Sequence, residues 1–195
     1  MKKTVVIVFM LIVSIMLSAP AYAQSAKEAV MGLKKLQARC QSGISYRDYG
    51  NALADAKFPV NLFMESADAK KYPELTESIN KAMGHYEYAG QLWNLKISAK
   101  YDPPLRHGFF GVGTDTGKEI GKLYPQAVPG KEYGYFLDEL FLVIWGAASK
   151  ELDNATKLYT KTESDISNDC DKLKEENANL KKEIERLKSK FKVKR

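Results

Sequence analysis

The glycine-rich stretch at residues 111–118, GVGTDTGK, has the residue types that most suggest a chemical role in this chain of 195 residues. Glycine loops hold phosphate when four residues separate the first glycine from a Gly-Lys-Ser/Thr sequence. Here Val112 occupies the place of that first glycine, and Glu119 follows Lys118. The dinucleotide fingerprint also fails, because the third glycine comes one place late. We therefore interpret these glycines as turn formers and expect no nucleotide cofactor.

The histidines and cysteines lack the spacing of a catalytic or metal site. His85 and His107 are distant in the sequence, and neither has metal-ligand spacing to a cysteine or to the other histidine. A Cys-His nucleophile pair would need the fold to bring remote residues together. We predict no catalytic residue, no metal and no other cofactor. An envelope enzyme that uses the segment 103–121 is an alternative interpretation.

The first 23 residues have the pattern of a cleaved signal peptide. Lys2 and Lys3 precede an apolar run over residues 5–17, and Ala21-Tyr22-Ala23 places small residues where signal peptidase needs them. The run is shorter than the roughly 20 residues that span a bilayer. We expect cleavage before Gln24, no transmembrane anchor in the mature chain, and a periplasmic or secreted protein.

Export affects the two cysteines, because an oxidising compartment permits disulfides. Cys40 and Cys170 can form a bridge within one chain, form a bridge between two chains, or remain as buried thiols. All three outcomes are open at the level of the sequence.

The most regular pattern lies near the C-terminus, where seam positions alternate by steps of four and three residues. In a heptad labelled a to g, Asn177 takes an a position and leucine recurs at d. The members of this pattern, called the seam residues below, are Ile166, Cys170, Leu173, Asn177, Leu180, Ile184, Leu187 and Phe191. Leucine at d with one asparagine at a favours two parallel strands. We predict a homodimeric coiled coil over residues 166–193.

The charges beside the seam residues agree with this register. In a parallel pair, each g residue faces the e residue of the following heptad on the partner. The three resulting pairs are opposite in sign: Asp169 with Lys174, Glu176 with Lys181, and Glu183 with Lys188. A helix packed back on its own body and a solvated charged helix are the alternatives, and a trimer is also compatible with the pattern.

The net charge of +6 is concentrated at the two ends of the chain. Residues 24–170 hold 18 basic and 19 acidic residues, whereas residues 171–195 hold 10 basic and 5 acidic residues. The last ten residues contain only basic charges: Arg186, Lys188, Lys190, Lys192, Lys194 and Arg195. Such an end is either a solvated tail or a contact for an anionic surface such as lipid. Export and a nearly neutral body argue against a nucleic-acid partner.

Helical periodicity over residues 24–97 predicts a three-helix module, which precedes the glycine-rich stretch and the seam residues in the chain. The first helix covers 26–41, Ser45 with Asp48 marks the start of the second, and Pro73 suits the first turn of a third. Pro59 should kink or break the second helix. Short connections favour an antiparallel arrangement. The apolar stripes predicted to form the core are Ala29, Leu33, Leu36 and Cys40; Tyr46, Tyr49, Leu53, Ala56, Val60 and Phe63; and Leu75, Ile79, Met83, Tyr86, Gly90 and Trp93.

Three segments of this module, ISYRDY at 44–49, ALADAK at 52–57 and VNLF at 60–63, carry a resemblance. Together they resemble a recurring N-terminal helical module of uncharacterised exported bacterial proteins, over roughly residues 26–97. The resemblance implies a helical fold and secretion, and it transfers no catalytic residue.

Residues 98–131 contain four prolines and several glycines and show neither a helical nor a strand period. We interpret this segment as a long Gly/Pro-rich loop and a candidate functional region. Helical periodicity returns over residues 132–165, which predicts a core helix leading into the coiled coil.

The predicted fold class is therefore all-α: a short antiparallel helical bundle, a Gly/Pro-rich loop, and a long C-terminal helix that ends in a parallel dimeric coiled coil. The predicted function is that of a non-catalytic exported structural or interaction protein of the bacterial cell envelope. A periplasmic chaperone-like holdase is a further alternative. The expected partners are a second copy of the chain and either an envelope protein or an anionic lipid surface.

Overall fold

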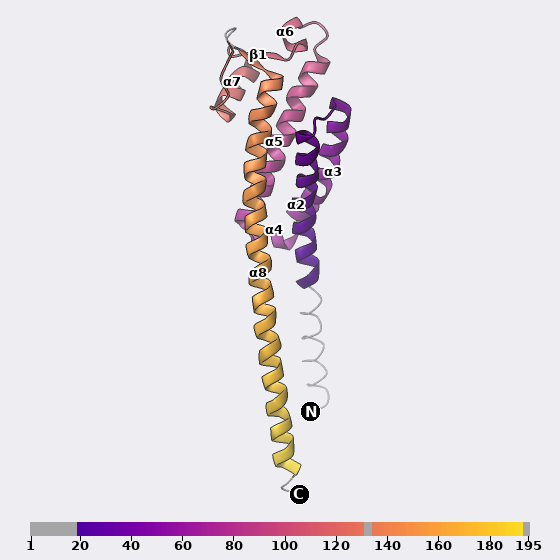
Figure 1. Cartoon of the computed structure of the whole chain (residues 1–195), viewed down its shortest axis with the longest axis vertical. Coiled ribbons are helices and arrows are strands. Elements are labelled where there is room, and N and C mark those ends of the chain that lie inside the picture. Colours follow the sequence, from indigo (N-terminus) through magenta and orange to yellow (C-terminus); the bar gives the residue numbers. More distant parts are fainter. Residues whose placement is uncertain (1–18, 131–133, 193–195) are drawn as a thin grey trace. The chain divides into compact units, whose positions relative to one another are not determined.

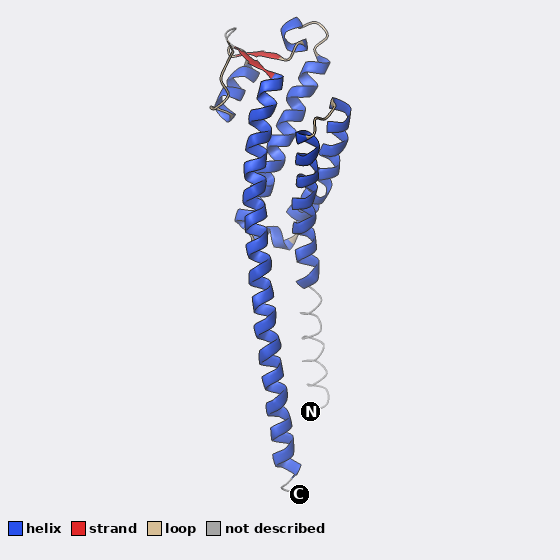
Figure 2. Cartoon of the chain, in the orientation of Figure 1, coloured by secondary structure: helices blue, strands red, loops and turns tan. Residues whose placement is uncertain are grey.

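The computed structural model describes residues 19–130 and 134–192, and these residues are mostly helical (Figure 2). The core of the predicted signal peptide, residues 1–18, lies outside the described residues. Figure 1 shows the elements in chain order, which are α2 (Ala19–Gln41), α3 (Tyr46–Glu65), α4 (Ala67–Lys71), α5 (Pro73–Ser98), α6 (Pro103–Arg106), β1 (Phe109–Gly111), α7 (Asp115–Leu123), β2 (Gly134–Phe136) and α8 (Leu137–Lys192). None of the helices in the described part of the chain is long and apolar enough to cross a membrane.

The turn between α2 and α3 follows the predicted local chemistry. Gly43 adopts a φ of 83°, a left-handed conformation that suits glycine after the last turn of a helix. The Ser45 hydroxyl oxygen accepts the Asp48 N–H at 3.2 Å and donates to the Asp48 carboxylate at 2.6 Å. The predicted start of the second helix is therefore confirmed.

Pro59 does not break α3, which runs without interruption from Tyr46 to Glu65. Of the predicted kink or break, the break does not occur, although an interior proline costs about 3 kcal/mol in an isolated helix. Tertiary packing accounts for the difference, because Val60 and Phe63, which follow the proline, are both buried in the core. The third predicted helix does begin at Pro73, as α5, and the sequence reading missed the short α4 before it.

The chain forms two compact units, Met1–Thr156 and Lys157–Arg195. In the first unit, α2 packs on α3, and α3 and α2 both contact α5. Aromatic contacts join these helices to the first part of α8: Trp93 lies 4.7 Å from Phe141 between ring centroids, and Tyr49 lies 6.0 Å from Trp145. Most of the predicted stripe residues are buried, and Tyr46, Leu53, Gly90 and Trp93 are half-buried.

The segment predicted as an irregular loop, residues 98–131, contains α6, β1 and α7. Strand β1 pairs with β2 in antiparallel register, with Phe109 opposite Phe136 and Gly111 opposite Gly134. The predicted helical fold with a long C-terminal helix is confirmed, and the structure adds this two-stranded sheet. The core helix begins at Leu137 instead of residue 132. Each strand has only three residues, which is too few to show a period, and the two strands are distant from each other in the sequence.

Candidate functional site

The seam residues lie on the second unit, along the C-terminal part of α8, which is drawn in yellow in Figure 1. In the single chain, Leu173 is 56% exposed, Leu180 57%, Ile184 50% and Leu187 46%. Large aliphatic side chains in a row at heptad spacing thus remain in contact with water. Ile166 is half-buried, and nothing is described of the side chain of Phe191.

Asn177 lies within this apolar row. Its side-chain N–H donates to the Leu173 carbonyl oxygen at 2.9 Å, a bond within the same helix. Its side-chain oxygen has no hydrogen-bond partner among the described residues. An asparagine in this state retains an acceptor for the amide of a second copy.

The charged residues beside the seam are only partly paired within the chain. Lys174 binds Asp171 at 2.8 Å and Lys188 binds Glu185 at 2.9 Å, each three residues away on the same helix. In the described part of the chain, no ion pair involves the residues predicted to meet in the central interchain contacts, which are Glu176, Lys181 and Glu183.

The two cysteines differ in environment. Both are free thiols; Cys40 is buried in the core of the first unit and Cys170 is exposed on α8. Burial raises the pKa of the Cys40 thiol to about 12, so its nucleophilic thiolate is scarce at neutral pH. Of the two, Cys170 is therefore the thiol open to oxidation.

The glycine-rich stretch that suggested phosphate binding has a structural role. The Thr114 hydroxyl accepts the Gly117 N–H at 3.0 Å and donates to the Gly111 carbonyl at 2.7 Å, which caps α7. A Cβ at Gly117 would lie 2.0 Å from the Gly111 carbonyl oxygen. The glycine therefore permits α7 to lie directly against the backbone of β1.

The described residues contain no group of three or more histidine, cysteine or acidic side chains that could hold a metal ion. His107 ends α6 and is exposed, whereas His85 lies on α5. At the basic C-terminal end, Arg186 and Lys188 are exposed. Nothing is described of the side chains of Lys190 and Lys192, and Lys194 and Arg195 lie outside the described residues.

A polar cluster that sequence reasoning missed joins α5 to the end of α7. His85 Nδ1 lies 2.8 Å from the hydroxyl oxygen of Tyr124, and the two rings are 5.5 Å apart. Burial raises the pKa of Tyr124 to about 12, so its hydroxyl keeps its proton at neutral pH and shares a hydrogen bond with the imidazole. The Tyr88 ring lies 5.8 Å from the Tyr124 ring and extends the cluster.

Lowering the pH from about 7.5 to about 5 is expected to destabilise the protein in part through His85. Burial lowers the pKa of His85 below its ordinary value of 6.5; the nearby Glu151 opposes this shift and Lys81 adds to it. The unfolded chain takes up the proton first as the pH falls, so the free energy of unfolding decreases below pH 6.5.

Urea denaturation over this pH range, compared between the wild type and His85→Gln, measures the contribution of His85. The variant has no titrating imidazole, so it should lose less stability than the wild type between the two pH values. Equal losses would contradict the assigned role of the His85–Tyr124 pair.

Comparison of the chain with models of protein families, with curated proteins and with solved structures finds no match. The resemblance of residues 26–97 to exported helical modules stays a prediction.

Proposed function

We propose that this chain is a non-catalytic, exported structural or interaction protein of the bacterial cell envelope, in which a parallel coiled coil joins two copies of a helical bundle. The observation that carries the proposal is the row of half-exposed seam residues on α8, from Leu173 to Leu187.

Burial of this row favours a second copy as its partner. Fully burying one leucine or isoleucine contributes about 1.5–3 kcal/mol, so side chains that are half-exposed to begin with contribute about 1 kcal/mol each. The contribution is doubled by the symmetry-related side chains of the partner, which gives several kcal/mol for the described part of the seam. Charged rows along both edges keep the surfaces outside the seam in water.

Parallel, in-register pairing follows from Asn177 and the edge charges. Two Asn177 side chains can satisfy each other only when they lie at the same level of the seam. Parallel pairing also places Glu176 opposite Lys181 of the partner. Antiparallel pairing would instead bring acidic edges together and lysine edges together.

A parallel dimer also brings its two basic ends together. Arg186 and Lys188 are exposed, so pairing doubles the positive charge at one end of the coil. A concentrated positive charge attracts an acidic surface more strongly than a single tail does. We propose that this end contacts an acidic envelope protein or an anionic lipid surface.

Non-reducing gel electrophoresis of the protein from a periplasmic fraction tests the location and the pairing together. Cys170 takes an a position, so the two copies of this thiol face each other across the proposed seam. Each thiol gives up one proton and one electron to the oxidants of that compartment, and the two sulfurs form one bond.

We expect a covalent dimer for the wild type and for Cys40→Ser, and only a monomer for Cys170→Ser. A periplasmic wild-type protein without any covalent dimer would remove the interchain disulfide. A covalent dimer that persists in Cys170→Ser would contradict the proposed register.

A further inference from the structure

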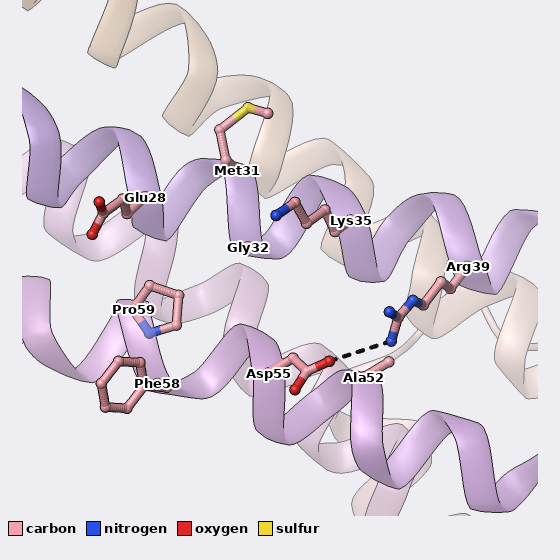
Figure 3. A pocket seen from close by; sticks show the side chains of 9 residues that line it. All are labelled: Glu28, Met31, Gly32, Lys35, Arg39, Ala52, Asp55, Phe58 and Pro59. Atoms are coloured by element: carbon pink, nitrogen blue, oxygen red, sulfur yellow. Dashed lines mark hydrogen bonds and ion pairs between the residues drawn. The ribbon is translucent and has the colours of Figure 1, made fainter.

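A groove runs between α2 and α3 on the first unit (Figure 3). The two helices approach closely at Gly32, because a Cβ there would lie 2.9 Å from Cγ of Pro59. Ala52 is buried and contributes only a methyl group to the lining. The groove has a volume of about 370 Å³, which lies in the range of small-molecule sites.

Large apolar side chains on the rim of this groove are left in water. Phe58 is 68% exposed and Met31 is 46% exposed, and both line the groove together with Pro59. A ligand with an apolar body would remove this surface from water, which is favourable in proportion to the area covered.

Two basic residues of the lining lie toward one end of the groove, and Asp55 lies beside them (Figure 3). Lys35 and Arg39 are one turn apart on α2, and Lys35 forms no ion pair within the described residues. Arg39 reaches across to Asp55, but the nitrogen–oxygen distance is 3.5 Å and both side chains are mostly exposed (Figure 3). An exposed ion pair of this kind contributes little to stability, so another anion can take the place of Asp55 beside Arg39. Glu28 lies at the opposite end of the groove and disfavours an anion there (Figure 3).

We propose that this groove binds a single-chain amphiphilic anion, a molecule with an unbranched apolar body and one carboxylate or sulfate head. The body would cover Phe58, Met31 and Pro59, and the head would lie between Lys35 and Arg39. The size of the groove favours a free small molecule over a bilayer or a folded protein domain. The site lies on the first unit and does not depend on the coiled coil.

Fluorescence titration of the full chain with dansyl-undecanoate, below the concentration at which this probe aggregates, tests the charge arrangement. Lys35→Glu should weaken binding by about tenfold, because it replaces a cation at the head by an anion. Asp55→Asn should strengthen binding, because it removes the competing carboxylate from Arg39. Lys27→Glu is the matched control, since Lys27 is exposed on α2 but does not line the groove.

Phe58→Ala, compared with Leu62→Ala on the same helix, tests the apolar part of the site. Leu62 is 49% exposed and does not line the groove, so only the Phe58 variant should weaken binding. Competition with dodecanoate should displace the probe, and neutral dodecanol should displace it poorly.

Three outcomes would overturn the proposal: equal effects of Lys35→Glu and Lys27→Glu, equal competition by dodecanol and dodecanoate, or binding that occurs only to vesicles of anionic phospholipid. Circular dichroism of each variant separates a loss of binding from a loss of fold.

Discussion

Replacing Leu180 by aspartate is expected to separate the proposed dimer into monomers, with a dissociation constant at least about 100-fold higher than that of the wild type. The substitution removes two apolar side chains from the seam and introduces two carboxylates, one from each chain. In a parallel pair these carboxylates would face each other in the dry centre of the interface, and their burial without a partner is unfavourable.

Ala178→Asp is the matched control for this change. Residue 178 is exposed and takes the b position of the same heptad, on the outside of a coiled coil. It receives the same new charge two residues away from Leu180, and we expect little change in the dissociation constant. Analytical ultracentrifugation over a concentration series measures both variants. A similar response of the two variants would show that charge, and not the seam, controls association.

Replacing Gly117 by alanine is expected to reduce the free energy of unfolding by about 2 kcal/mol. Helix propensity alone would favour the alanine by about 1 kcal/mol. In a helix without tertiary contacts the same substitution would therefore increase the free energy of unfolding, whereas we expect a decrease here. The reason is the approach of the new Cβ to within 2.0 Å of the Gly111 carbonyl oxygen and 3.0 Å of the Val112 Cα. Backbone atoms cannot move aside as the end of a flexible side chain can.

Gly113→Ala provides the control from the same stretch, because a Cβ there would meet no described atom within 4 Å. We expect its urea unfolding midpoint to remain close to that of the wild type. A neutral or stabilising Gly117→Ala would contradict the close packing of α7 on β1, and the glycines would then act only as turn formers.

Long periodic elements were predictable from the sequence because their signals are local and repeated. The predicted helix start at Ser45 and Asp48 is present in the structure, and so is the proline at the start of α5. Core positions such as Leu33, Phe63 and Ile79 followed from helical spacing alone, and all three are fully buried.

The elements that the sequence did not reveal depend on contacts between distant residues. Strand β1 is defined by its pairing with β2, in which Phe110 lies opposite Tyr135, and neither strand has enough residues to show alternation. The His85–Tyr124 contact likewise joins residues on different helices. Thr114 with Asp115 was a local signal for the start of α7, since both match the preferences of a helix N-terminus.

The continuity of α3 through Pro59 shows the limit of a local rule. Proline predicts a break because it removes one hydrogen bond and crowds the preceding turn. In the folded chain, Ala56 in the turn before the proline and Val60 directly after it are both buried. Their burial offsets the local penalty.

Sedimentation equilibrium of the exported chain, beside a truncation that ends at Asp165, tests the central claim most directly. The truncation removes all of the seam residues and leaves the helices of the first unit in place. We predict twice the chain mass for the whole protein and a single chain mass for the truncation. Single chain masses for both proteins, or paired masses for both, would contradict the proposal that the C-terminal part of α8 joins two copies.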